Sequence, residues 1–385
     1  MFRDAPRAHP EVGDGTVHPM SGAFTDEHEE IRRYVRQWLD ERAPIDVVRK
    51  TMETEAGFNP SLWSDLGELG WLGMALDEDF GGGGLGFMEL AVVAEEMGRT
   101  LFPSPFLSTV VIGAGLVAGV ATKEQSRSIL PDVAGGALRL AAAVAPAARV
   151  SVAGTEVDGG WRLTGEAGFV LDGHTADLLI VEAGVAGESR LFLVEMGAEG
   201  LEARPDSVLD LTRPMARVSV EGTPARPLGE GDEDVEAARE EMVVRAVGAL
   251  AMEQVGGAQA CLDLSVEYAK DRHQFGRPIG SFQAVKHMCA DMLVEVESAR
   301  SAAYHLAWAI DHDPGEARIA APLAKAYCAD AYYRAAASTI QIHGGIGFTW
   351  EHHAHLHLKR AKSGQLLFGD SVYHRTRLAD RLGIG

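Results

Sequence analysis

The sequence predicts a three-part chain in which helical N- and C-terminal domains flank a small β domain. Apolar residues recur at helical spacing as far as about residue 135, and again from about residue 232 to the end. Between Leu138 and Pro227 the chain carries short alternating runs rich in valine, separated by glycine turns, a pattern typical of a β-sandwich or barrel. At 385 residues the chain is long enough for two or three cores. We expect domains at residues 23–135, 136–230 and 231–385, after a flexible extension at 1–22.

The N-terminal domain is predicted to begin with a helix capped by Thr25. Asp26 and Glu27 would occupy the first turn, where the helix dipole favours acidic side chains. Apolar residues then follow at helical spacing, at Ile31, Val35, Trp38 and Leu39. Four more helical patterns complete the domain and cover Pro60–Leu72, Phe87–Thr100, Pro105–Ala118 and Lys123–Ile129.

The rest of the chain divides into short strands followed by long helices. The alternating runs predict strands at Val150–Val152, Leu178–Val181, Arg190–Val194 and Ala216–Val220. Helical patterns then cover Val235–Asp271, Ser281–His312 and Glu316–His343. Because these helices are far longer than the globular average of about 12 residues, they indicate a four-helix-type bundle.

The composition excludes several classes of protein. A formal net charge of −21 argues against non-specific nucleic-acid binding, and it means that any site for an anionic ligand must be basic locally. The three cysteines are scattered through apolar, helix-like stretches, so they indicate neither a disulfide framework nor a zinc site and fit a reducing cytosol. No apolar run approaches the length of a membrane span, and residues 1–22 lack a hydrophobic signal core. We therefore expect a cytoplasmic protein without membrane contact.

Three glycine-containing segments carry the most specific information. The first runs from Leu66 through Gly81–Gly84 to Glu95-Glu96-Met-Gly98. On turn chemistry alone it is a helix connector, because no Lys-Ser/Thr follows the glycines as in a phosphate loop. The third begins at Gln341, where a helix ends and the backbones of Gly344 and Gly345 are free to approach a ligand closely.

The second segment joins two helices through a Gly-Pro-Gly turn and brings Arg272, Phe275 and Gln283 near one another. A diphosphate needs a guanidinium, an adenine face needs an aromatic ring, and the adenine edge needs an amide. Taken alone, the segment is better explained by Arg272 and Arg277 as cations that neutralise a helix C-terminus.

Together, in this order and spacing, the three segments resemble the acyl-CoA dehydrogenase family, from Phe24 to about Leu382. The resemblance implies FAD between the middle and C-terminal domains, with a neighbouring subunit completing the site, in an oligomer that is usually a dimer of dimers. It implies that Arg272 and Phe275 hold the diphosphate and adenine of the neighbour's FAD and that Gln283 serves the same cofactor. The residues expected to line the adenosine end are Gln341, Gly344 and Gly345.

The middle domain departs from the family pattern near the flavin ring. Phe169 stands where the family has a strand beside that ring and is expected to pack on it, but Leu171 lacks the hydroxyl that would bond to it. The loop that helps the family to bind flavin and thioester is replaced by Ala141–Pro146.

The family's reaction removes the α-proton of an acyl thioester while the β-hydrogen leaves as hydride to flavin N5, so it needs a poised carboxylate base. Counting along the resemblance places that glutamate at Phe368, with Leu367 before it, so both are expected to shape the substrate pocket. Relatives that carry the base on an earlier helix have it at the position of Ala246. The remaining candidates are Glu253, whose pKa burial would raise, and Asp370.

Each candidate base has an alternative explanation. Glu253 is also explained as a buried or interface acid paired with an arginine, since unpaired buried carboxylates are rare. Asp370 is also expected to contact the cofactor, because the family often places a cofactor-binding threonine there. His353 and His357 lie one helical turn apart, but no acid other than Glu351 is near enough to complete a metal site, and we expect no metal.

The first hypothesis is therefore an FAD-dependent acyl-CoA dehydrogenase that passes electrons to an electron-transfer flavoprotein and uses a substitute base. A second is a non-catalytic subunit that completes the FAD site of another family member in a heterotetramer. The patterns Ala-x-Glu-x-Val-Gly at Ala251 and Leu-Phe-Gly-Asp at Leu367 resemble the small chains of such heteromeric, actinobacterial-type dehydrogenases. A third is an acyl-thioester oxidase or flavin-binding protein of a biosynthetic pathway.

Overall fold

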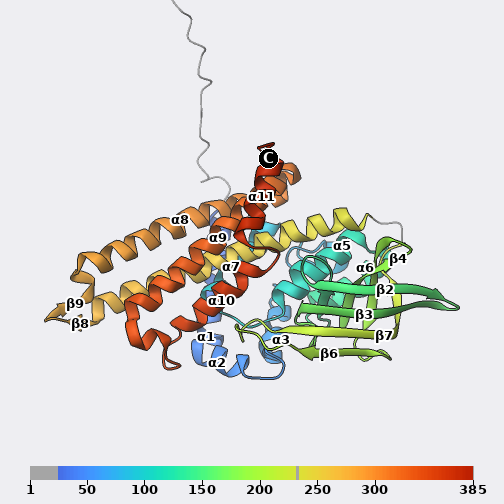
Figure 1. Ribbon diagram of the computed structural model, residues 1–385, viewed down its shortest axis with the longest axis horizontal. Coiled ribbons are helices and arrows are strands. Elements are labelled where there is room, and N and C mark those ends of the chain that lie inside the picture. The colour runs from blue at the N-terminus through green and yellow to red at the C-terminus, as the bar shows by residue number, and fades with distance from the viewer. Residues whose placement is uncertain (1–24, 231–233, 385) are drawn as a thin grey trace, which may run out of the picture.

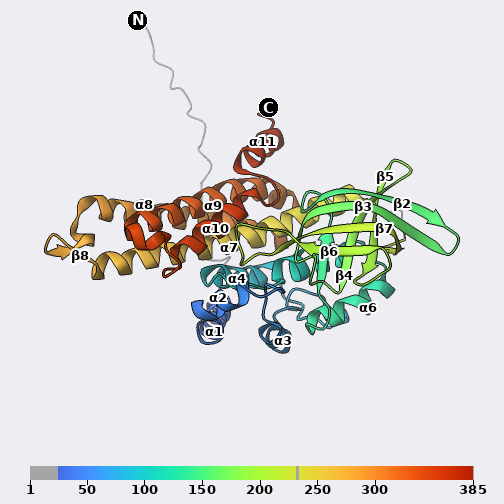
Figure 2. The same cartoon turned by 60° about the horizontal axis from the view of Figure 1, so that its bottom comes forward.

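The computed structural model describes residues 25–230 and 234–384, so the extension predicted for residues 1–22 lies outside them. Helices, strands and helices follow one another along the described chain, as the sequence predicts (Figure 1). The strands form a barrel at one end of an elongated molecule, and the long C-terminal helices extend from it (Figure 2).

The N-terminal part begins where predicted, with Thr25 as the N-cap of the first helix. It also contains a helix that the sequence does not predict, α2 between Pro44 and Glu53. Eight residues are too few to show helical periodicity in the sequence. Its elements are α1 (Asp26–Arg42), α2 (Ile45–Met52), α3 (Pro60–Glu68), η2 (Glu78–Phe80), α4 (Phe87–Arg99), the π-helical η3 (Phe106–Gly113), α5 (Ala114–Val120) and α6 (Lys123–Ala134).

The middle strands close into a barrel. Their circuit runs β4–β2–β3–β7–β5 and returns to β4, while β1 pairs with β4 and β6 with β7. The alternating pattern predicts a sandwich or a barrel, and the structure shows the barrel. The strands are β1 (Leu140–Ala143), β2 (Arg149–Val157), β3 (Gly160–Leu171), β4 (Leu178–Val185), β5 (Glu188–Glu195), β6 (Leu201–Pro205) and β7 (Met215–Pro227).

The C-terminal part is a bundle of long helices. The predicted end of α7 at Asp271 is confirmed, and Asp313 caps α9 by accepting hydrogen bonds from the backbone of Gly315 and Glu316 at 3.0 and 3.1 Å. Its elements are α7 (Val235–Asp271), β8 (His273–Gln274), β9 (Arg277–Pro278), η4 (Ile279–Ser281), α8 (Gln283–His312), α9 (Pro314–His343), η5 (Gly344–Phe348), α10 (Ala354–Leu366) and α11 (Ser371–Arg381).

Two glycines fix how the N-terminal helices meet the bundle. A Cβ on Gly98 of α4 would overlap the carbonyl oxygen of Glu253, and a Cβ on Gly256 of α7 would overlap that of Glu95. The two helices therefore cross with their backbones in contact, which only glycine permits. This crossing sets the position of Glu253 on α7.

Buried acids next to the crossing anchor the surrounding helices. Glu95 accepts a hydrogen bond from Tyr304 at 2.6 Å and pairs with Arg32 at 3.0 Å and with Arg300. Glu96 pairs with Arg36 at 2.7 Å.

No helix in the described residues is long and apolar enough to cross a membrane.

Candidate functional site

Phe368 lies in a tight turn between α10 and α11, buried in the main core. Its backbone is left-handed, with φ of 59°, and Gly369 follows with φ of 104°. Only 2% of Phe368 is exposed, and the core that contains it also contains Ala246 and Leu367. A bulky residue rarely adopts this backbone, so the surrounding structure must hold the turn in place.

Two side chains hold that turn through its carbonyl groups. The ammonium of Lys325 on α9 donates to Gln365 O at 3.2 Å and to Gly369 O at 3.0 Å. His374 on α11 lies with Nε2 3.0 Å from Phe368 O and donates to it as the neutral ring. Burial lowers the pKa of Lys325 to about 8 and that of His374 to about 4.

Glu253 is locked in a buried ion-pair network rather than free. Arg213 donates through Nη2 to both of its carboxylate oxygens, and Arg360 on α10 pairs with it at 3.2 Å. Burial favours the neutral acid, yet the two guanidinium groups outweigh it and lower the pKa of Glu253 below its ordinary value. The predicted raised pKa is therefore wrong, and the alternative of an acid paired with arginine is the one observed.

The same network joins the barrel to the bundle. Arg360 Nε lies 3.2 Å from Asp210 Oδ2 and donates to Thr212 Oγ1 at 3.0 Å, so its guanidinium connects the loop before β7 with α7. Burial would lower the pKa of Arg360, but Glu253 and Asp210 raise it above its ordinary value. Each charged group of this network pairs with a group of opposite charge, an arrangement that joins two parts of a structure.

Asp370 acts as a helix cap. Its carboxylate accepts a hydrogen bond from the backbone N–H of Tyr373 at 2.8 Å, at the start of α11. Asp370 is exposed, whereas Phe368 two residues earlier is buried. The two residues therefore face different surroundings.

Of the residues expected to hold FAD, those of the second and third glycine-containing segments gather at the end of the bundle far from the barrel, where β8 lies (Figure 1). Strands β8 and β9 form a small hairpin there, and Phe275 at its tip is 91% exposed with φ of 54°. Arg272 and Gln283 are exposed, and within the described residues their side chains make no hydrogen bond or ion pair.

The glycine turn after α9 lies at this same end. Tyr268 of α7 stacks on His343 of α9 with ring centroids 4.2 Å apart, which brings the two motif segments together. Gln341, Gly344 and Gly345 are exposed, and a Cβ on either glycine would meet no atom within 4 Å. The backbone there is open to a ligand, as expected.

Phe169 belongs to strand β3 of the barrel, and β3 lies away from the tip of the bundle (Figure 2). It occupies a bulge in β3, where the register against β7 shifts between Ala167 and Val170, and the bulge turns its ring outward to 50% exposure. Arg149 lies over the ring at 5.7 Å. Within one chain, the barrel residues therefore lie apart from the bundle-end residues. A site that uses both groups needs a second chain.

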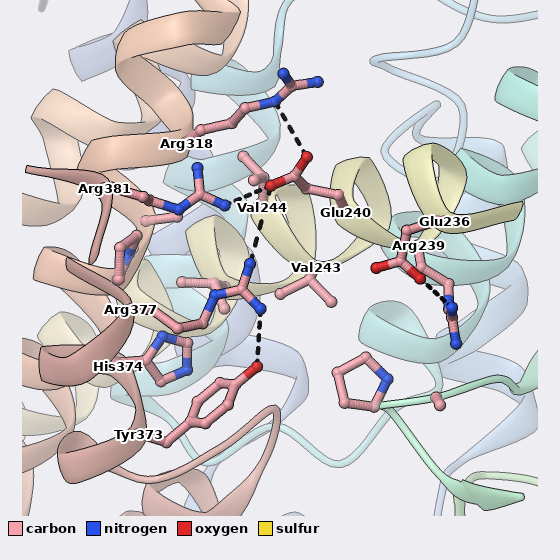
Figure 3. A pocket seen from close by; sticks show the side chains of 15 residues that line it. Glu236, Arg239, Glu240, Val243, Val244, Arg318, Tyr373, His374, Arg377 and Arg381 are labelled. Atoms are coloured by element: carbon pink, nitrogen blue, oxygen red, sulfur yellow. Dashed lines mark hydrogen bonds and ion pairs between the residues drawn. The ribbon is translucent and has the colours of Figure 1, made fainter. Parts of the chain in front are cut away.

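An arginine-lined cleft, absent from the sequence analysis, opens beside the Phe368 turn (Figure 3). It lies between the loop at Pro146, the first half of α7, the start of α9 and α11. Its charged residues are Glu236, Arg239, Glu240, Arg318, Arg377 and Arg381, with His374 and Tyr373 beside them. The available signal was the spacing of Tyr373, Arg377 and Arg381 on one face of a helix.

The histidines near α10 are packed as neutral rings. His357 is 2% exposed, and its Nδ1 lies 2.9 Å from the Tyr332 hydroxyl. Burial lowers the pKa of His357 to about 3 and that of His353 to about 4. Within the described residues no three histidine, cysteine or acidic side chains are grouped to hold a metal ion.

Comparison with known proteins agrees with this architecture. Residues 25–137 match the family model "Acyl-CoA dehydrogenase, N-terminal domain", and residues 241–383 match "Acyl-CoA dehydrogenase, C-terminal domain". The chain is 33% identical over 347 residues to acyl-CoA dehydrogenase IpdE2 of Mycolicibacterium smegmatis, which covers 90% of this chain and 96% of that protein. The chain belongs to the acyl-CoA dehydrogenase family.

Solved structures share the fold over nearly the whole chain. The Tcur3481–Tcur3483 steroid ACAD variant is 31% identical, with a TM-score of 0.83 over 93% of this chain and 98% of that one. The ChsE4–ChsE5 complex from Mycobacterium tuberculosis is 27% identical, with a TM-score of 0.85 over 94% of this chain and 98% of that one.

Proposed function

We propose that this acyl-CoA dehydrogenase chain has no base of its own and completes the FAD site of a second, base-bearing family member in a heteromeric enzyme. The observation that carries the proposal is Phe368. By the family resemblance it stands where the glutamate base belongs, and it is 2% exposed in a turn held by Lys325 and His374. A buried hydrocarbon ring accepts no proton.

The two substitute bases are poorly arranged for proton abstraction. A general base works best with a pKa near the working pH and a free lone pair toward the substrate. Glu253 has its pKa lowered and both oxygens engaged by Arg213, with Arg360 on one of them. Asp370 directs its carboxylate to the N–H of Tyr373. The second of our initial hypotheses therefore fits the geometry better than the first.

The bundle-end residues fit a dinucleotide cofactor. Arg272 offers unengaged guanidinium donors, Phe275 an exposed ring, and Gln283 and Gln341 exposed amides, beside the open backbone of the glycine turn. We infer that they hold the diphosphate and adenosine of the FAD that belongs to the partner's site. Bound FAD supplies the acceptor for the hydride that leaves the β-carbon of an acyl thioester.

The partner is inferred to be a second acyl-CoA dehydrogenase chain. The barrel and bundle-end residues of one chain lie apart, so a composite site requires another chain. The ChsE4–ChsE5 neighbour supports a pairing of two different family members. Electrons from the reduced enzyme would leave to an electron-transfer flavoprotein.

The decisive experiment uses variants in the complex of this chain with a base-bearing family member. Glu253→Gln and Asp370→Asn in this chain are expected to leave the rate of flavin bleaching by acyl-CoA within about twofold, whereas Arg272→Ala should release FAD. A loss of bleaching of a hundredfold or more in Glu253→Gln or Asp370→Asn, with FAD retained, would place the base on this chain and overturn the proposal.

A further inference from the structure

Three aromatic rings from three segments of the chain pack together at the end of the bundle that carries the bundle-end residues. His343, the last residue of α9, packs against Tyr268 of α7 and against His352 of the loop before α10. Its ring centroid lies 4.2 Å from that of Tyr268 and 4.4 Å from that of His352. Because His343 is only 5% exposed, this Tyr268–His343–His352 stack is part of the interior of the bundle.

The stack connects the two segments that are proposed to hold FAD. The backbone carbonyl of Tyr268 accepts the backbone N–H of Arg272 at 2.8 Å. His343 directly precedes Gly344, whose φ of 64° turns the chain out of α9. The contact between the rings of Tyr268 and His343 therefore links the arginine of one segment with the glycine turn of the other.

The hydrogen bonds of the two imidazoles define where their protons are. His343 donates its Nδ1–H to the carbonyl of Thr339 at 2.8 Å. His352 instead accepts through Nδ1, at 3.1 Å, from the backbone N–H of Ala354, the first residue of α10. A proton on that nitrogen removes the hydrogen bond and places a positive charge at the N-terminus of a helix, where the helix dipole disfavours it. The observed arrangement therefore requires a neutral His352.

The surroundings of the two imidazoles also oppose a positive charge. Arg49 of α2 donates to the carbonyl of His352 at 2.9 Å, so a cation already lies beside the stack. Burial lowers the pKa of His343, and burial together with His343 and Arg49 lowers the pKa of His352. Within the described part of the chain, neither imidazole forms an ion pair with the other titratable groups nearby, which are His353 and His355 of the same segment and Asp263 and Glu267 of α7.

We propose that His343 is a positioning residue for the FAD site, and that the stack holds the glycine turn against the Arg272 segment only while both imidazoles are neutral. The link to FAD rests on the proposed function, whereas the stack rests on its ring contacts and hydrogen bonds. In acid the rings would separate, and the arginine and the open glycine backbone would no longer face one diphosphate and its adenosine. Cofactor retention would thereby depend on pH.

Histidine NMR titration of the full-length chain tests the stack without any cofactor. His352 should titrate below its ordinary 6.5, and His343→Phe should raise its pKa, because a neighbouring ring that can carry charge is removed. A phenyl ring keeps the contact with Tyr268 and does not titrate. His312→Phe is the matched control, since His312 also stacks on an aromatic ring, Trp308, at 5.0 Å, but lies at the other end of α8 from the hairpin. It should leave the titration of His352 unchanged.

FAD affinity tests whether the stack positions the glycine turn. In the complex with a base-bearing family member, FAD should bind the wild type about tenfold more weakly at pH 5.5 than at pH 7.5, because only the stacked fraction is competent to bind. His343→Phe should reduce this difference to about twofold, and His312→Phe should leave it as in the wild type. Flavin fluorescence at each pH measures the affinity, and circular dichroism at the same pH verifies the fold.

His352→Asn repeats the test at the other imidazole, which is only partly buried and is therefore easier to replace. An asparagine oxygen can accept the N–H of Ala354 at the start of the helix, and it does not titrate. The loss of FAD affinity between pH 7.5 and pH 5.5 should therefore shrink in this variant as well.

The proposal is overturned if His352 titrates in His343→Phe as it does in the wild type, or if both variants lose FAD affinity in acid as the wild type does. Arg272→Ala in the same complex reports on the proposed function. If Arg272→Ala retains FAD, the bundle end does not hold the cofactor, and the proposed function and the positioning role both fail. If Arg272→Ala releases FAD while the acid loss is unchanged in the two histidine variants, only the positioning role is overturned.

Discussion

The ammonium of Lys325 lies 3.0 Å from the carbonyl oxygen of Gly369, the residue that follows Phe368. Lys325 is completely buried, and its second acceptor is the carbonyl of Gln365 in the last turn of α10. A buried cation is costly unless its hydrogen bonds are made. Here that cation holds the backbone of one turn, and the turn keeps its left-handed shape around a buried phenylalanine.

Lys325→Met should therefore destabilise the chain by about 2–3 kcal/mol, because two carbonyl groups lose a charged donor. Burial lowers the pKa of Lys325 to about 8 against an ordinary 10.5, so between these values the unfolded chain binds more protons. Lys325 therefore makes the free energy of unfolding of the wild type rise with pH between 8 and 10.5, and the variant lacks this rise. Urea unfolding at several pH values measures both. Identical pH slopes in the two proteins would contradict the assignment.

Phe368 and Phe275 form a matched pair, since both have a left-handed backbone but opposite exposure. Phe368→Ala should cost about 3–5 kcal/mol of unfolding free energy, because it empties a core position. Phe275→Ala should change stability by less than about 0.5 kcal/mol and instead weaken FAD retention in the complex. Denaturant unfolding and flavin absorbance after gel filtration separate the two. Equal losses of stability would show that burial is not what distinguishes the positions.

Glu253 should matter for stability rather than for turnover. Glu253→Gln leaves Arg213 and Arg360 with an unbalanced buried charge, which should cost about 3–5 kcal/mol. Glu202→Gln is the control, because its pair with Arg204 is exposed and should be worth less than about 1 kcal/mol. A Glu253→Gln variant as stable as Glu202→Gln would mean that the buried network contributes nothing.

Acid should weaken the histidine region. The pKa of His357 is lowered to about 3 and that of His353 to about 4 by burial, against an ordinary 6.5. The unfolded chain therefore binds more protons below pH 6.5, and stability falls by up to about 1.4 kcal/mol per pH unit for each group as the pH drops from 6.5 towards 4. His357→Gln should reduce this slope by one group while keeping an acceptor for Tyr332. An unchanged slope between pH 6 and pH 5 would contradict the buried neutral ring.

The sequence was sufficient for the fold because its signals were long or specific. The periodicity of α7 continues for 37 residues, and its predicted ends match the structure. Short elements give no such signal, since α2 has eight residues and makes little more than two turns. The sequence predicts one ordinary helix over Pro105–Ala118, whereas Phe106–Gly113 is π-helical, because an apolar pattern does not reveal hydrogen-bond spacing.

The site was harder to predict, because its decisive contacts join distant parts of the chain. The apolar neighbours of Glu253 along α7 suggested a raised pKa, whereas Arg213 lies 40 residues earlier and Arg360 107 residues later. The arginine cleft likewise combines α7, α9 and α11. Local patterns place a residue on a helix, but they do not show which charges tertiary packing brings to it.

The most direct test of the missing base is the flavin content and anaerobic bleaching of this chain, purified alone and then with a base-bearing partner. The account predicts no bleaching by acyl-CoA for the chain alone, and half occupancy with full bleaching of the bound flavin for the complex. A homo-oligomer of this chain that holds one FAD in every subunit and is bleached by acyl-CoA without a partner would contradict it.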